Sequence, residues 1–248
     1  MKPWILLDVA PATGDGLELR LYRRDDEFSI RAGRFELMNS RMHGSEDALG
    51  ELACSRIAGR PGPRVLVGGL GMGYTLAAVL RGLSLEGKIT VAELMPAVVK
   101  WNRGLLGALA GHPLRDERVT VCETDVARLL LAERQAYDAI LLDVDNGPKG
   151  LTRVGNDWLY GRSGLGAAFA ALRPGGVLAV WSAGPDQAFG NRTRKIGFKV
   201  EELRVHARGA SPGKTGSIRV DSGEERQVRE NAGGRARHII WIAVRPAQ

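Results

Sequence analysis

A glycine-rich segment followed at a distance by an acid is the feature of this chain with the clearest chemical meaning. Gly69, Gly71 and Gly73 follow the apolar run Val65–Val67, and Glu93 stands twenty residues after Gly73, at the end of a second apolar run. Glycines let a backbone approach a ligand closely, and an acid at the end of the next strand accepts hydrogen bonds from both ribose hydroxyls. The spacing therefore predicts a nucleoside site, in preference to a purely structural turn.

The residue after the glycines narrows the choice of ligand. Tyr74 stands where the third glycine of GxGxxG is expected, and its large side chain argues against the close helix packing found over a pyrophosphate. The pattern favours a nucleoside without phosphates, such as S-adenosylmethionine, over a nicotinamide dinucleotide. The predicted cofactor-binding residues here are Gly69, Leu70, Gly71, Met72, Gly73, Glu93 and Leu94.

An acid also follows the third apolar run. Asp125 comes after Val119–Cys122 and before a helical pattern, with Val126 beside it. Aspartate is a strong helix N-cap, and its carboxylate also suits the exocyclic amine of adenine. We weigh the two roles equally, since one aspartate can serve both, and place Asp125 and Val126 with the cofactor-binding residues.

The fourth apolar run, Ala139–Leu142, ends on Asp143. An isolated charge there is costly unless it has a partner. The alternatives are a structural hydrogen bond and a carboxylate beside the reacting group, and we assign Asp143 the catalytic role. Asp145 and Asn146 follow in the same loop as predicted acceptor-binding residues, although a turn role is slightly favoured for Asp145.

Alternating strand and helix patterns must position these residues. The runs are short and almost wholly apolar, as in a parallel sheet covered by helices on both faces, where ligands bind at the carboxyl ends of the strands. The expected strands are 65–67, 89–92, 119–122, 139–142 and 177–181, and the expected helices are 73–83, 96–109, 126–133, 158–172 and 187–196.

The two ends of the chain differ from this pattern. Alternating segments at 17–22, 27–31 and 34–38 predict β-hairpins, so we divide the chain into an N-terminal β-hairpin unit, 1–42, and a cofactor domain, 43–248. Two further strands, 198–205 and 238–244, have no helix between them and are expected to pair antiparallel at a sheet edge. Between them, about 207–237 reads as a long basic flexible loop.

Composition bounds the class of protein. Residues 190–248 hold thirteen basic and six acidic side chains, which accounts for the whole net charge of +7. That excess is an expected solvated surface rather than a nucleic-acid site, because aromatic residues are not interleaved with it. Cys54 and Cys122 are expected to be buried thiols. With no metal-ligand spacing, membrane span or secretion signal, we expect a metal-free, cytoplasmic protein without membrane association.

The ordered set of motifs resembles the spermidine synthase family. The resemblance runs from the hairpins to Trp181, and its implied fold is the Rossmann-like class I methyltransferase fold, a mainly parallel seven-stranded sheet with an antiparallel last strand. It implies that Glu93 holds the ribose, Asp125 the adenine amine and Asp143 the attacking amine. The family is commonly dimeric, which allows a homodimer here. The segments that carry it are Gly68–Gly73, Val91–Val99, Arg118–Val121, Thr124-Asp125, Tyr137–Asp143 and Leu172–Leu178.

Several positions depart from the family pattern. The family's aspartate that contacts the aminopropyl amine falls on Gly71, its second fourth-strand aspartate falls on Asn146, unless a shifted loop lets Asp145 serve, and its diamine-binding Tyr and neighbouring His fall on Leu49 and Gly50. A missing negative charge at position 71 favours intact S-adenosylmethionine, whose carboxylate an aspartate would repel. We therefore expect methyl transfer to a small acceptor such as an amine.

Three alternatives remain open at this point. The nearest is aminopropyl transfer from decarboxylated S-adenosylmethionine to a polyamine. A nucleic-acid-binding protein or nucleic-acid methyltransferase would use the basic last quarter, although the fourth strand lacks a base-flipping motif. A non-catalytic adenosyl-binding protein is also compatible, because a fold does not fix a function.

Overall fold

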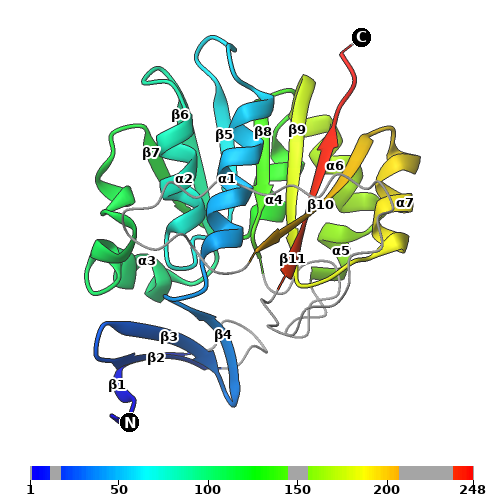
Figure 1. Ribbon diagram of the computed structural model, residues 1–248. Helices are drawn as coiled ribbons and strands as arrows, with labels where there is room; N and C mark the ends of the chain where they lie inside the picture. The colour runs from blue at the N-terminus through cyan, green and yellow to red at the C-terminus, as the bar shows by residue number, and fades with distance from the viewer. Residues whose placement is uncertain (1, 12–17, 145–155, 207–236, 248) are drawn as a thin grey trace.

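The computed structural model describes residues 2–11, 18–144, 156–206 and 237–247. They form a small antiparallel sheet followed by a large α/β unit, and the small sheet lies below the large one in Figure 1. The small sheet has the order β1-β2-β3-β4. Its strands are β1 (Ile5–Ala10), β2 (Leu19–Arg24), β3 (Glu27–Ala32) and β4 (Phe35–Asn39).

The large sheet has seven strands in the order β10-β11-β9-β8-β5-β6-β7. Strand β11 alone runs opposite to the other six strands, because it pairs antiparallel with both β9 and β10. This confirms the mainly parallel sheet and the antiparallel last strand. The strands are β5 (Arg64–Gly68), β6 (Lys88–Glu93), β7 (Val119–Glu123), β8 (Tyr137–Leu142), β9 (Leu172–Ser182), β10 (Lys199–His206) and β11 (Arg237–Val244).

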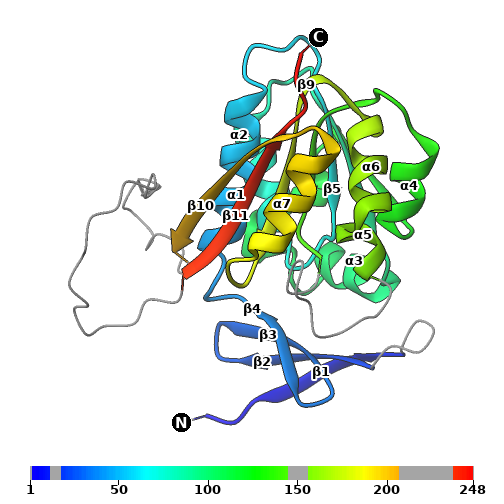
Figure 2. The ribbon, with the colours of Figure 1, turned by 90° about the vertical axis from the view of Figure 1, so that its right-hand side faces the viewer.

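Helices cover both faces of the large sheet, as Figure 2 shows. Buried residues of α1, α2 and α3 share one apolar cluster with the small sheet, and those of α4 to α7 form a second on the opposite face. The helices are α1 (Gly44–Arg56), α2 (Tyr74–Gly82), α3 (Pro96–Arg103), α4 (Val126–Ala132), α5 (Asn156–Tyr160), α6 (Arg162–Ala171) and α7 (Gln187–Ile196), with 3₁₀ turns at Gly107–Ala110 and Pro113–Arg115.

The central strands show why short apolar runs sufficed to predict this sheet. In β5, Val65 and Val67 face one apolar cluster and Leu66 faces the other, and all three are buried. A strand covered on both faces needs no polar alternation. Burying apolar surface on both sides contributes roughly 25 cal/mol per Å².

Some elements differ from the sequence predictions. Strand β1 was not predicted, because it is an edge strand whose Ile5, Leu6 and Val9 remain exposed and give no regular alternation. The helix predicted over 96–109 ends at Arg103 and continues as a 3₁₀ turn, and the one predicted over 158–172 is interrupted at Gly161.

The two cysteines do not share one environment. Cys54 is buried in α1, where burial raises the pKa of its thiol to about 11. Cys122 in β7 is only half-buried, so the prediction of two buried thiols was wrong for Cys122. It lies on the outermost strand of that side of the sheet, where neighbours cover less of each residue.

Candidate active site

The glycine segment after β5 forms a tight loop against the end of β8. Gly69, Gly71 and Gly73 all have positive φ, at +86°, +54° and +87°. A Cβ atom at Gly69 would lie 2.5 Å from the carbonyl oxygen of Asp143. Glycine is therefore required at Gly69 both by the left-handed backbone and by the close approach of two strand ends.

Glu93 ties this loop to the end of β6. Its Oε2 accepts a hydrogen bond from the backbone N–H of Leu70 at 2.9 Å, and its Oε1 accepts one from the N–H of Met95 at 2.8 Å. The side chain is 8% exposed, and burial raises its pKa while the backbone donors oppose that shift. The backbone N–H groups of Leu94 and Gly71 also act on this carboxylate and lower its pKa, so it is held by backbone donors of the glycine loop and of the end of β6. Leu94, which follows Glu93 in the sequence, is 38% exposed.

Asp125 caps α4 at the neighbouring strand end. Its Oδ1 accepts a hydrogen bond from the backbone N–H of Ala127 at 2.8 Å, while the residue stays exposed. The capping role is therefore present, and it uses one of the two carboxylate oxygens of this exposed residue. Val126 is buried below the start of the glycine loop, where its side chain lies 3.0 Å from an added Cβ at Gly68.

Asp143 directly follows β8, and its carboxyl group is hydrogen-bonded to Thr75. Its Oδ2 accepts a hydrogen bond from the hydroxyl of Thr75 at 2.7 Å, and its backbone N–H donates to the carbonyl of Gly68. Burial raises the pKa of Asp143. Thr75 lies in the first turn of α2, directly after the glycine loop, so one turn of chain connects the loop with the Asp143 carboxyl.

A second carboxyl, Glu46 of α1, faces the same space. Burial and the negative charge of Asp143 raise the pKa of Glu46 to about 8, although the hydroxyl of Ser45 donates to its Oε2 at 2.7 Å. Two carboxyls in this relation resist ionising together. At neutral pH Glu46 therefore holds a proton.

Both carboxyls line a pocket of about 100 Å³ below the glycine loop. The indole of Trp181, from the end of β9, also lines it, and its buried Nε1 has no hydrogen-bond partner among the described residues. The small sheet closes one side through β4. The complete lining is Leu37, Met38, Asn39, Glu46, Leu70, Gly71, Met72, Tyr74, Thr75, Asp143 and Trp181.

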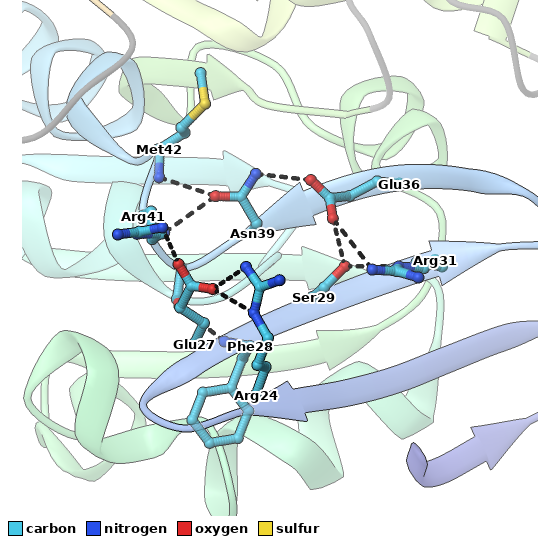
Figure 3. A network of polar contacts seen from close by, with 10 residues as sticks. Arg24, Glu27, Phe28, Ser29, Arg31, Glu36, Asn39, Arg41 and Met42 are labelled. Carbon is cyan, nitrogen blue, oxygen red and sulfur yellow. Dashed lines mark hydrogen bonds and ion pairs between the residues drawn. The ribbon is translucent and has the colours of Figure 1, made fainter. Parts of the chain in front are cut away.

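A polar network fixes β4 where it meets the pocket, as Figure 3 shows. The Oδ1 atom of Asn39 accepts hydrogen bonds from the backbone N–H groups of Arg41 and Met42, each at 3.1 Å, and its Nδ2 donates to Glu36 at 2.8 Å. This holds Met38 close to the glycine loop, so that its Sδ lies 3.3 Å from where a Cβ of residue 71 would stand. The wall opposite Gly71 is therefore a thioether and carries no charge.

The structure brings some of the predicted site residues together and separates others. Leu70, Gly71, Met72 and Asp143 line the pocket, and Glu93 binds the backbone of Leu70 next to it. Gly69, Gly73, Leu94, Asp125 and Val126 lie outside the pocket wall, at the loop and at the neighbouring strand ends. Asp145 and Asn146 fall outside the described residues.

Sequence reasoning missed Glu46, Thr75, Met38 and Asn39 as site residues. Of these four residues, predicted elements covered only Met38, as the last residue of the alternating segment 34–38, and Thr75, in the expected helix 73–83. An available signal was position, because Glu46 opens the helix directly before β5 and Thr75 is the second residue after the glycine loop.

Metal-binding clusters and membrane-spanning helices are both absent from the described parts of the chain. Within them, no group of three or more His, Cys, Asp or Glu side chains is placed to hold a metal ion. None of the described helices is long and apolar enough to cross a membrane.

Comparison of the sequence with family models and with curated proteins gave no match. Solved structures do match. Spermidine synthase from Thermotoga maritima superposes with a TM-score of 0.70 at 15% identity, over 98% of this chain and 74% of that one. A spermidine synthase in complex with the transition state analogue AdoDATO gives 0.69 at 14% identity, over 98% and 73%.

A methyltransferase also matches over a shorter part of the chain. Precorrin-6y C5,15-methyltransferase from Geobacter metallireducens GS-15 gives a TM-score of 0.51 at 14% identity, over 79% of this chain and 86% of that one. At these identities the likeness concerns the fold. The chain has a spermidine synthase-like class I methyltransferase fold, complete with the N-terminal antiparallel sheet, as its motifs predicted.

Proposed function

We propose that this protein is a transferase that uses an adenosyl sulfonium cofactor, with methyl transfer from S-adenosylmethionine to a small amine as its reaction. The observation that carries the proposal is the Asp143–Glu46 pair, which lines one pocket with the backbone of the glycine loop. The cofactor would supply an electrophilic carbon on a positively charged sulfur. Glu93 would hold its ribose, and the exposed oxygen of Asp125 would accept from adenine.

The chain's own part in such a reaction is positioning and proton removal. With Glu46 protonated and Asp143 ionised, the pair would carry one negative charge, and an acceptor ammonium would fit beside it. Asp143, fixed by Thr75, takes one proton from it and orients the free amine. The free amine so oriented would supply the lone pair for the new bond to carbon, and the electrons of the carbon–sulfur bond would remain on sulfur. Such alignment contributes about 7–11 kcal/mol at its best.

The absence of a side chain at Gly71 supports the methyl assignment. The wall facing it is the uncharged Met38, so nothing there repels the carboxylate of intact S-adenosylmethionine. Glu46, neutral below a pKa of about 8, adds little repulsion at neutral pH.

One observation favours aminopropyl transfer as a second candidate. The ionisable acids that line the pocket are Glu46 and Asp143, and no lysine or arginine accompanies them among its lining residues within the described chain. A pocket without a cation suits the amine tail of decarboxylated S-adenosylmethionine better than a carboxylate.

Isothermal titration calorimetry with both cofactors separates the candidates. The methyl assignment predicts equal or tighter binding of S-adenosylmethionine. Tighter binding of the decarboxylated form by about tenfold or more, about 1.4 kcal/mol, would overturn it. Mass spectrometry of putrescine incubated with each cofactor then identifies the added group, and failure to bind either cofactor would overturn the transferase proposal itself.

A further inference from the structure

The carboxyl of Glu46 is connected through Ser45 to a histidine of β11. The hydroxyl of Ser45 lies 2.7 Å from Oε2 of Glu46, and the Nδ1 atom of His238 lies 2.9 Å from the same hydroxyl oxygen. Ser45 is completely buried, whereas His238, in β11 at the sheet's antiparallel end, is half-buried. Three residues from the two ends of the chain thus form one continuous hydrogen-bonded path.

We propose that Glu46, Ser45 and His238 form a proton relay that connects the pocket with the first residues of β11. The proposal rests on the proposed function for the origin of the proton, since that function delivers one proton to the pair in each turnover. The pair already holds a proton on Glu46 at neutral pH. A second proton, taken by Asp143 from an acceptor ammonium, leaves the pair neutral and must be lost before the next cycle.

The three side chains allow two matched arrangements of hydrogen atoms. When Glu46 is ionised, the Ser45 hydroxyl donates to Glu46, and His238 donates to Ser45 from Nδ1–H. When Glu46 is protonated on Oε2, it donates to Ser45, whose hydroxyl then donates to an unprotonated Nδ1, so the neutral imidazole carries its proton on Nε2. Switching between them moves a proton from Glu46 to the Nδ1 of His238, which completes the step by releasing Nε2–H to solvent.

The surroundings of both ends suit this transfer. The titratable groups that face Glu46 are Asp143 from the end of β8, Asp47 from its own helix and Tyr74 from α2. Burial lowers the pKa of His238, so its ring is neutral at physiological pH and able to accept a proton. The ring is held edge-on to Trp181, with centroids 4.6 Å apart at 69°, and so keeps Nδ1 directed toward Ser45.

The tautomer of His238 is a direct readout that requires neither cofactor nor acceptor. Nitrogen-15 NMR of the ring, assigned by its loss in His238→Gln, should report Nε2–H below the pKa of Glu46, about 8, and Nδ1–H above it. In Ser45→Ala the tautomer should no longer follow the ionisation of Glu46. Ser55→Ala is the matched control, because Ser55 lies on the same helix and donates to the carbonyl of Leu52.

A His238 ring that keeps one tautomer across this pH range in the wild-type protein would overturn the relay, as would an unchanged switch in Ser45→Ala. Both outcomes are independent of transfer activity, so the relay and the proposed function fail separately. Where transfer is measured, Ser45→Ala and His238→Gln should lower kcat about tenfold with KM unchanged, which is less than the roughly 10²- to 10⁴-fold effect of removing a direct general acid or base. The control His206→Gln, on β10, should leave kcat unaltered.

Discussion

The buried acids at the ends of β6 and β8 have different hydrogen-bond partners. On the β6 side, Glu93 is buried but receives a backbone N–H on each oxygen, so its hydrogen bonds oppose the effect of burial. On the β8 side, Asp143 and Glu46 receive hydroxyl groups and face each other, and both pKa values rise. Backbone donors thus make an acid a fixed acceptor, whereas a neighbouring carboxyl makes it a site that exchanges protons.

The largest expected effect is on the β8 side. Asp143→Asn keeps the shape of the side chain but removes the proton acceptor, so transfer should fall by about 10²- to 10⁴-fold. Affinity for the adenosyl cofactor, held on the β6 side, should change little. Steady-state rates and calorimetry on the same preparation check this, and a parallel loss of cofactor affinity would contradict the division of labour between the two halves.

Gly69→Ala tests how closely the two halves meet. The added methyl group would lie 2.5 Å from the carbonyl oxygen of Asp143 at a φ of +86°, so we expect destabilisation by about 3 kcal/mol or more. Gly111→Ala is the control, since it has a φ of +75° with nothing within 4 Å of its Cβ and should cost only about 1–2 kcal/mol. Urea unfolding of both variants measures the steric part as the difference, and equal values would show that the strand ends separate freely.

Glu46→Gln tests the shared proton through stability. The pKa of Glu46 is raised in the folded state, so the folded protein binds more protons than the unfolded chain between pH about 4.5 and about 8. Stability is therefore greatest below this range and falls as pH rises through it, by up to about 1.4 kcal/mol per pH unit.

Urea unfolding across this range should give a shallower slope for Glu46→Gln than for wild type. Asp143, also raised by burial, leaves a residual slope of the same sign. Glu51→Gln, on the same helix with a side chain 45% exposed, should change the slope much less. An unaltered slope in Glu46→Gln would show that Glu46 titrates normally.

The smallest expected effect concerns Asp125. Asp125→Ala removes the cap of α4 and should cost about 1 kcal/mol, whereas Asp125→Asn retains a capping oxygen and should leave stability nearly unchanged. If the carboxylate also accepts from adenine, Asp125→Asn should still weaken adenosyl binding several-fold. Thermal unfolding measures the capping role and calorimetry measures the binding role. Unchanged affinity for the adenosyl ligand in Asp125→Asn would show that Asp125 serves only as a helix cap.

The same contrast explains what could be predicted from the sequence. The site on the β6 side could be predicted because the glycine loop and Glu93 are close in the sequence. They lie on consecutive strand–helix units, and the apolar runs of these units fall in one continuous stretch of chain. The β8 side depends on α1 and β4, which precede the large sheet and reach the pocket only through tertiary packing. Asp143 was predicted from its strand, but its partners Glu46 and Thr75 were not, and no local pattern brings Ser45 to His238.

The central claim is that an adenosyl group lies across the ends of β5, β6 and β7 with its ribose at Glu93. Calorimetry with 5′-methylthioadenosine and its 2′,3′-dideoxy analogue, on wild type and on Glu93→Gln, tests this most directly. We predict that the dideoxy analogue binds wild type about tenfold or more weakly, a loss of about 1.4 kcal/mol or more, and that Glu93→Gln largely removes the difference. Equal affinity of wild type for the two nucleosides would contradict the account.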